Sequence, residues 1–301
     1  MHIITAQQIE DLHISPATCV EWVTGSFKMK YDSQCPAKIS VHPEGNDFIT
    51  TMPALLPRHT NTFGVKVVSR INGRHPALRS DLMLFDSHKG NIKALVDADW
   101  ITNMRTGAVA ALTMKTLRRT NAHTIAMIGL GNTAHATLTC IASIFPDEQL
   151  EIRLMKYKNH AEQFIHDFSS YQNLTFTIVD NPKDFAQGSE IIISCVTEAK
   201  SLLIEQDEYF DEGVLVIPIH TRGFQNCDLF FDKVFADDTD HVRGFRYFDR
   251  FKQFDELSRV LLEDNPGREN DKERILAYNI GLGLHDTLFA YRIYQQLYSE
   301  L

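Results

Sequence analysis

The feature that most constrains the fold is a glycine turn between an apolar run and a predicted helix, at residues 124–144. The run TIAMIGL leads into GLGNTA at positions 129–134, which has the G-x-G-x-x-A spacing of a dinucleotide-binding turn. The first glycine permits the tight turn, the second lets the backbone approach a pyrophosphate, and the alanine allows close packing of helix on strand. Free N–H groups at the helix start attract phosphates. We therefore predict that a nicotinamide dinucleotide contacts Gly129, Gly131, Asn132 and Thr133.

After this turn, predicted strands and helices continue to alternate along the chain. Apolar runs typical of strands occupy 151–157, 174–179, 190–196 and 213–219, and HAEQFIHDF at 160–168 is typical of a helix. Strands that alternate with helices indicate a parallel sheet covered on both faces. The alternative, a tight turn in an α/β domain without a ligand, is less consistent with this context. We predict an α/β fold with a Rossmann domain over residues 120–276.

The residues before the turn have a different pattern. Residues 15–31 are predicted to form a helix, because Ser15 can cap it and Pro16 suits the first helical position. Short runs rich in β-branched and aromatic residues between 36 and 97 predict an antiparallel or mixed sheet, followed by a helix over 98–118. After about residue 271 a single long, apolar helix is expected, from 273 to 297. We predict an α+β domain of residues 1–119 completed by the C-terminal helix, 277–301.

The end of the second strand of the Rossmann domain bears on the choice between NAD and NADP. NAD-binding proteins place Asp or Glu there to hold the ribose 2′-hydroxyl. This chain instead has Lys156 and Lys158 around Tyr157, and basic side chains suit a 2′-phosphate. The alternative is that both lysines are solvated surface residues. NADP or NAD is the expected cofactor, with Lys156 near the adenosine ribose.

Composition excludes several other classes of protein. A net charge of −9 and the absence of long Lys/Arg runs argue against a nucleic-acid partner. The start of the chain lacks a basic and then apolar leader, and no run is long enough to span a membrane. The histidines lack metal-binding spacing, and no G-x-S-x-G elbow is present, so neither a metal site nor a serine hydrolase is expected. The five cysteines are odd in number and scattered, which suggests free thiols and a cytoplasmic location for the protein. They are Cys19, Cys35, Cys140, Cys195 and Cys227.

Three further segments carry a resemblance to a known family. They are GVKVV at 64–68, NMRTGA at 103–108 and G-x-G-x-x-D at 281–286. With the glycine turn between the second and third, the chain resembles the ornithine cyclodeaminase/μ-crystallin family from about residue 36 to 298. The resemblance implies a homodimer formed through the N-terminal domain, and an active site between the domains. It also implies that Lys66 approaches the reacting carbon, that Arg105 grips the substrate carboxylate near the nicotinamide, and that the cofactor contacts Arg105, Thr106, Thr197 and Gly281.

The chemistry of these side chains agrees with those roles. A guanidinium can fork onto a carboxylate through two parallel hydrogen bonds, as required of Arg105. A lysine in a partly desolvated cleft has a lowered pKa and can transfer protons, as required of Lys66. Without the family pattern, an exposed lysine on an edge strand and a helix-surface arginine would be the simpler interpretations.

Two positions depart from the family pattern. Where many members have an arginine in a P-x-R segment, this chain has Lys38, which keeps the charge and loses the fork. Where ornithine cyclodeaminases carry a catalytic Asp, the alignment gives His220, which can relay protons near neutral pH. We therefore expect an NAD(P)H-dependent reductase of a small imino acid, or an amino-acid dehydrogenase. The alternatives are an ornithine cyclodeaminase and a non-catalytic protein that binds NADP or a small ligand.

Overall fold

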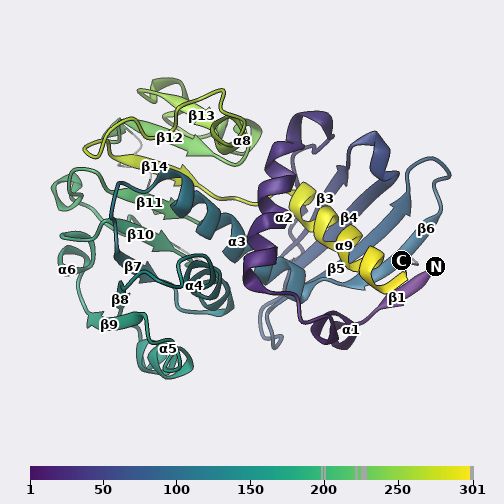
Figure 1. The fold of residues 1–301 in the computed structure, drawn as a ribbon, viewed down its shortest axis with the longest axis horizontal. Coiled ribbons are helices and arrows are strands. Elements are labelled where there is room, and N and C mark those ends of the chain that lie inside the picture. Colours follow the sequence, from purple (N-terminus) through teal and green to yellow (C-terminus); the bar gives the residue numbers. More distant parts are fainter. Residues whose placement is uncertain (198, 200, 221–222, 225–228, 299–301) are drawn as a thin grey trace. The chain divides into compact units, whose positions relative to one another are not determined.

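The computed structural model describes residues 1–197, 199, 201–220, 223–224 and 229–298. It consists of two compact units, Met1–Arg105 with Leu282–Leu301, and Thr106–Gly281 (Figure 1). Helix α3 (Asp99–Leu117) begins in the first unit and ends in the second. The domain boundaries expected at 119/120 and 276/277 stay a prediction, since compactness alone does not define domains.

The first unit contains a six-stranded sheet in the order β1-β6-β5-β4-β3-β2. Neighbouring strands from β2 to β6 are antiparallel, whereas β1 runs parallel to β6, so the expected mixed sheet is present. Strand β1 and the short helix α1 (Ala6–Asp11) were not predicted, because each is too short to show a period. The strands are β1 (His2–Ile4), β2 (Ile39–Val41), β3 (Phe48–Leu55), β4 (Thr62–Arg70), β5 (Leu78–Asp86) and β6 (Ile92–Asp97).

Two long helices lie over one face of this sheet. Helix α9 (Gly283–Tyr298) packs on β3, β4 and β5, and α2 (Pro16–Lys28) packs on α9 (Figure 1). The predicted cap of α2 is confirmed, because the Thr18 N–H donates to Ser15 Oγ at 3.1 Å. Single turns of 3₁₀ helix occur at Lys30–Asp32 (η1) and Arg58–Thr60 (η2).

The contact between α9 and the sheet depends on glycine. A Cβ atom at Gly64 of β4 would lie 2.5 Å from Thr287 Oγ1, and one at Gly283 would lie 2.8 Å from the Met52 carbonyl oxygen. Real Cβ atoms do not approach other atoms so closely. The first turn of α9 therefore reaches the backbone of β3 and β4 only because both positions lack side chains, and this brings Asp286 to the sheet.

The opposite face of the same sheet carries several partly exposed apolar side chains, together with the exposed Asp81. Alternation along the strands places Val65 and Met83 there, half-buried, while their neighbours Lys66 and Leu82 face α9. Toward the two edges the same face carries Ile39 and Leu95, which are 67% and 39% exposed. Exposed apolar side chains that gather on one face of a sheet are typical of an interface with another protein.

The second unit contains an eight-stranded sheet in the order β13-β12-β14-β11-β10-β7-β8-β9, and every pairing in it is parallel. This confirms the predicted parallel sheet of an α/β fold. The strands are β7 (Thr124–Ile128), β8 (Leu150–Met155), β9 (Leu174–Val179), β10 (Ile191–Ser194), β11 (Leu215–Pro218), β12 (Lys233–Ala236), β13 (Phe254–Glu256) and β14 (Ile275–Tyr278). The helices are α4 (Asn132–Ile144), α5 (His160–Asp167), α6 (Pro182–Ala186), α7 (Thr239–Val242) and α8 (Leu257–Leu261), with 3₁₀ turns η3 (Asp207–Tyr209) and η5 (Phe248–Arg250).

The single helix expected from 273 to 297 was wrong in its first part. Ile275–Tyr278 is strand β14, paired with β11 on one side and β12 on the other, and the helix begins only at Gly283. A short apolar run gives no period that separates a buried strand from a buried helix. Strands β12 and β13 were also not predicted.

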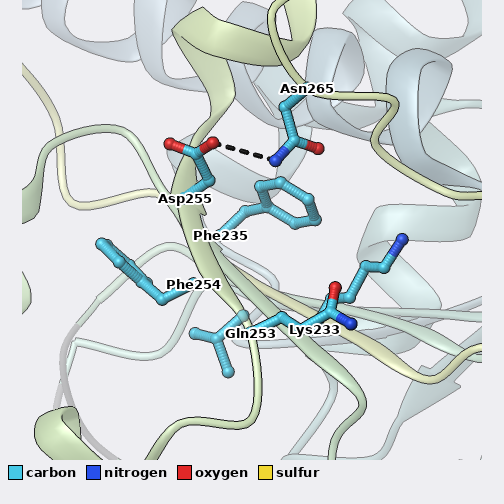
Figure 2. Close-up of a pocket in the computed structure, with 7 residues that line it drawn as sticks. Lys233, Phe235, Gln253, Phe254, Asp255 and Asn265 are labelled. Atoms are coloured by element: carbon cyan, nitrogen blue, oxygen red, sulfur yellow. Dashed lines mark hydrogen bonds between the residues drawn. The ribbon is translucent and has the colours of Figure 1, made fainter.

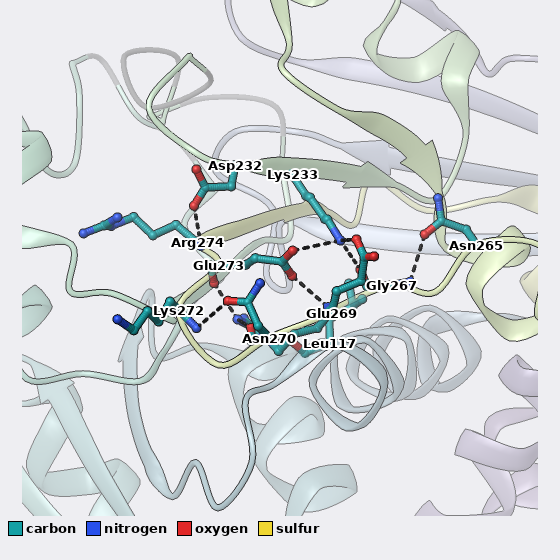
Figure 3. Close-up of polar contacts among 11 residues, drawn as sticks. Leu117, Asp232, Lys233, Asn265, Gly267, Glu269, Asn270, Lys272, Glu273 and Arg274 are labelled. Atoms are coloured by element: carbon teal, nitrogen blue, oxygen red, sulfur yellow. Dashed lines mark hydrogen bonds and ion pairs between the residues drawn. The ribbon is translucent and has the colours of Figure 1, made fainter.

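A buried lysine fixes the loop that precedes β14. Lys233 of β12 has a side chain only 5% exposed, and its Nζ lies 2.6 Å from Glu269 and 3.1 Å from Glu273 (Figure 3). It also donates to the Gly267 carbonyl oxygen at 2.7 Å. Because a buried ammonium is costly unless its donors are satisfied, these contacts explain how a lysine is accommodated inside the sheet.

Two further observations concern the whole chain. None of the helices in the described ranges has both the length and the hydropathy needed to cross a bilayer. Cys19, Cys35, Cys140 and Cys195 are free thiols, whereas Cys227 lies outside the described residues.

Candidate active site

The first unit buries a cluster of three charged side chains from three separate elements. Lys66 of β4 donates from Nζ to Asp286 Oδ1 at 2.7 Å, and Arg105 of α3 donates from Nε to the same oxygen at 2.9 Å. Lys66 and Asp286 are fully buried, and Arg105 is 7% exposed. Lys66 Nζ also lies 3.4 Å from Thr102 Oγ1. We call Lys66, Arg105 and Asp286 the charged triad.

Local structure explains why the triad forms. Lys66 follows Gly64 by two positions on β4, so both face α9, and the absence of a side chain at Gly64 admits the turn of α9 that carries Asp286. Lys66 and Arg105 were predicted as site residues from the sequence, whereas Asp286 belonged to the G-x-G-x-x-D segment and had no predicted role. The available signal was an acidic residue inside an otherwise apolar helix segment.

The electrostatics of the triad are unbalanced, because two cations share one carboxylate. Burial lowers the pKa of Lys66 to about 7, and the nearby charge of Arg105 acts in the same direction. The charge of Lys38 also contributes, so this half-buried lysine lies within electrostatic reach of Lys66. Burial alone would raise the pKa of Asp286, but the charges of Arg105 and Lys66 outweigh it and the pKa is lowered.

The triad also retains unused hydrogen-bonding groups. Among the described residues, the only hydrogen bond of the Arg105 guanidinium is the one from Nε, which leaves both Nη groups for a ligand. Asp286 Oδ2 is buried and has no hydrogen-bond partner within the described part of the chain. An anion with two oxygens would receive a fork from the Nη groups and would neutralise the excess positive charge.

In the second unit, the glycine turn has the geometry of a phosphate-binding loop. Gly129 has a φ of +83°, and a Cβ there would lie 2.5 Å from the Val196 nitrogen, so both backbone conformation and space require glycine. A Cβ at Gly131, the N-cap of α4, would meet nothing within 4 Å. The first N–H groups of α4, beginning at Asn132 and Thr133, have no partners within a helix. These residues fit the pyrophosphate of a dinucleotide.

The remaining predicted cofactor residues lie after the ends of strands of the eight-stranded sheet or on α3. Thr197 follows β10 and is exposed, and Thr106 on α3 is half-buried. Gly281 follows β14 with a φ of +95°, and its N–H donates to Asp237 Oδ2. Lys156 and Lys158 are both exposed after β8.

His220 lies just beyond the end of β11. Its Nε2 is 2.7 Å from Ser194 Oγ, at the end of β10, and its ring stacks near Phe224 with centroids 6.3 Å apart. Ser194 is fully buried and was not predicted as a site residue. The two residues that follow His220, Thr221 and Arg222, lie outside the described residues.

A separate pocket lies beside strands β12 and β13 and contains none of the predicted site residues (Figure 2). Asn265 donates to Asp255 Oδ2 at 2.9 Å within it. Lys233, which also lines it, is held by the structural contacts described above. The residues that line it are Lys233, Val234, Phe235, Gln253, Phe254, Asp255 and Asn265.

Comparison with known proteins identifies the family. The model of the ornithine cyclodeaminase/mu-crystallin family matches residues 2–300. The chain belongs to this family. The chain is 24% identical over 270 residues to the nodulation efficiency protein NfeD of Rhizobium meliloti, covering 86% of this chain and 83% of that protein. It is 24% identical over 258 residues to a Δ1-pyrroline-2-carboxylate reductase of Bacillus cereus, covering 79% and 78%.

A solved structure shares the fold along nearly the whole chain. It is the Δ1-pyrroline-2-carboxylate reductase of Thermococcus litoralis in complex with NADH and L-proline. The TM-score is 0.86 at 22% sequence identity, and the match covers 99% of this chain and 98% of that one. The predicted α/β fold and the predicted family are thus both confirmed.

Proposed function

We propose that this protein is an NAD(P)H-dependent oxidoreductase that reduces a small imino acid, or oxidises the corresponding amino acid in the reverse direction. The charged triad carries the proposal, because two buried cations on a single carboxylate create a site for a substrate carboxylate. The names of the relatives support it, since they include reductases of pyrroline-2-carboxylate and of iminosuccinate.

The triad suggests a division of labour in the reaction. The Nη groups of Arg105 would hold the substrate carboxylate, with Lys38 adding positive charge nearby. A bound NAD(P)H would supply a hydride to the imine carbon. The C=N double bond becomes a C–N single bond, and the imine nitrogen takes up one proton, which the Lys66 ammonium is able to donate because its pKa is about 7. His220 is a second candidate for proton transfer.

Substrate binding should depend on the protonation of Lys66. Since burial lowers its pKa, Lys66 is an ammonium below about pH 7 and loses its proton above it. The dissociation constant of an unreactive ring carboxylate such as pyrrole-2-carboxylate should therefore rise by up to about tenfold per pH unit above pH 7. Calorimetric titration from pH 6 to 9 measures this. In Lys66→Met the constant should vary little, and an equal constant at pH 7 and 9 in the wild type would contradict the assignment.

The charged residues that follow β8 predict the preference between NADPH and NADH. With Lys156 and Lys158 exposed and no acid beside them, NADPH should bind at least as tightly as NADH. Quenching of protein fluorescence by each nucleotide gives the two constants. A preference for NADH of about tenfold, equal to roughly 1.4 kcal/mol, would show that these lysines do not contact a 2′-phosphate.

One assay separates the proposed function from its alternatives. The first measurement is the oxidation of NADPH or NADH in the presence of pyrroline-2-carboxylate. The second is the formation of ammonia and proline after incubation with ornithine and NAD. Together they distinguish the reductase, the cyclodeaminase and the non-catalytic binding protein. Reduction of the imine with little ammonia release supports the reductase. Robust proline formation from ornithine would mean that His220, held by Ser194, replaces the acid of a cyclodeaminase. Nucleotide binding without turnover on a panel of imino acids would favour a non-catalytic binding protein.

We further propose that two copies of the chain associate through the exposed apolar face of the six-stranded sheet. Leu95→Glu places a charge on that face and should convert the dimer to a monomer in sedimentation velocity. Leu262 of the second unit is a matched control, because it is 36% exposed against 39% for Leu95. Leu262→Glu should leave the dimer intact, and a monomeric wild type would refute the proposal. The cytoplasmic location expected from the sequence stays a prediction.

A further inference from the structure

The imidazole of His135 joins the glycine turn to helix α5. His135 lies near the start of α4, and its Nδ1 is 3.0 Å from the Gly131 carbonyl oxygen. Its Nε2 is 2.9 Å from Oδ2 of Asp167, the last residue of α5. The ring also packs against Phe164 and Phe168, with centroids 4.5 Å and 5.7 Å away. Polar contacts at both nitrogens and aromatic contacts on the ring therefore fix its orientation.

Both polar contacts require a proton on the ring. A carbonyl oxygen and an ionised carboxylate can only accept hydrogen bonds. The hydrogen bonds that Gln163 and His135 donate lower the pKa of the Asp167 carboxyl, which is therefore ionised near neutral pH. A neutral imidazole has one N–H and can make only one of the two bonds, whereas the imidazolium makes both. The arrangement therefore selects the protonated form of His135.

The bond from His135 acts on the part of the turn that is suited to approach a pyrophosphate. The N–H of Gly131 donates to the Gly129 carbonyl oxygen at 2.8 Å. The carbonyl oxygen of Gly131 accepts from the backbone N–H of His135 at 3.0 Å as well as from its ring. Because glycine has more backbone freedom than other residues, these bonds limit the conformations that the turn can adopt. Loss of the proton from Nδ1 would instead place a nitrogen lone pair against that carbonyl oxygen.

We propose that His135, paired with Asp167, is a positioning residue that holds the glycine turn in its nucleotide-binding conformation while the imidazole is protonated. This inference rests on the proposed function, because it assumes that NAD(P) binds at the turn. Histidine changes its charge near neutral pH, so the contact is expected to respond in that range. Loss of the proton removes one of the two bonds and a positive charge beside the pyrophosphate site. Both changes weaken the binding of nucleotide as the pH rises.

A second histidine contributes to the same contact from α5. His166 Nδ1 lies 3.5 Å from Oδ1 of Asp167, and its side chain is 82% exposed against 34% for His135. Its protonation acts on the shared carboxylate and is another source of pH dependence. The variant His166→Gln removes that source and leaves His135 in place, so it is the matched control.

The dissociation constant of NADH, measured without substrate from pH 6 to 8.5, tests the inference. NADH is the suitable probe because it lacks the 2′-phosphate of NADPH, which itself titrates at about pH 6. In the wild type and in His166→Gln the constant should rise by about three- to tenfold over this range, as expected for the loss of one hydrogen bond. His135→Phe keeps an aromatic ring and donates no hydrogen bond. It should bind NADH as weakly at pH 6 as the wild type does at pH 8.5.

Asp167→Asn is the most specific variant, because it changes which form of the ring can make both contacts. Its amide NH₂ can donate to Nε2, so a neutral imidazole satisfies both partners and keeps the bond to Gly131. The dissociation constant should then stay low and nearly constant from pH 6 to 8.5. A wild-type pH profile in Asp167→Asn, or equal constants at the two pH values in the wild type, would overturn the inference and leave the proposed function intact. A wild type that binds neither NADH nor NADPH would overturn both.

Discussion

Replacing Arg105 with alanine is expected to reduce kcat/KM for the imino-acid substrate by on the order of a hundredfold or more. The two Nη groups are the groups in the triad best suited to donate two parallel hydrogen bonds to the substrate carboxylate. Without them, the desolvated carboxylate of the substrate has no partner. Arg105→Lys should recover little of the loss, because an ammonium cannot make the fork.

The same substitution should leave folding and nucleotide binding nearly unchanged. Without Arg105, the pair Lys66–Asp286 remains as one cation and one anion at 2.7 Å, which is a better balance of charge than the native triad. Steady-state kinetics, thermal unfolding and nucleotide titration together test this. Arg79→Ala is the control, because Arg79 is an arginine of β5 that is 45% exposed and pairs with Asp99. Wild-type kinetics in Arg105→Ala would mean that the carboxylate binds elsewhere.

Asp286→Asn is expected to destabilise the protein by about 3–5 kcal/mol, because it leaves two buried cations without a counter-charge. The loss should be greatest at low pH. The pKa of Lys66 is already below its ordinary value, so the folded chain gives up this proton more readily than the unfolded chain. Stability therefore rises with pH from about 7 toward the pKa of the unfolded lysine, and in Asp286→Asn this window should extend to lower pH.

Urea unfolding of Asp286→Asn at pH 6, 7.5 and 9 measures both effects. The double variant Lys66→Met/Asp286→Asn is the matched control, because it removes one of the two cations together with the anion. It should recover a large part of the lost free energy of unfolding. A change below about 1 kcal/mol in the single variant would show that the charges of Lys66 and Arg105 are screened by water and that Asp286 does not hold the triad together.

The sequence predicted features that depend on local pattern, and it missed those that depend on distant contacts. The glycine turn at 129–134 and the strands around it were predicted correctly, because residues close together in the sequence are enough to determine their structure. The link from Asp286 to Lys66 joins residues 220 positions apart, and no period in the sequence indicates it. Strand β14 was assigned to a helix because four apolar residues fit either element. The pairing of Ser194 with His220 depends on the order of strands, which alternation alone does not give.

The position of α9 has a consequence for how the chain folds during synthesis. Residues 106–281 form one compact unit that is continuous in sequence, so all of its internal contacts are available before α9 is made. The sheet that carries Lys66 is made earlier and must wait for α9, which supplies both its covering helix and the carboxylate that Lys66 and Arg105 share. Until then its apolar face and two cations remain without their partners. The covering and the charge balance of the six-stranded sheet are therefore completed only after the end of the chain has been made.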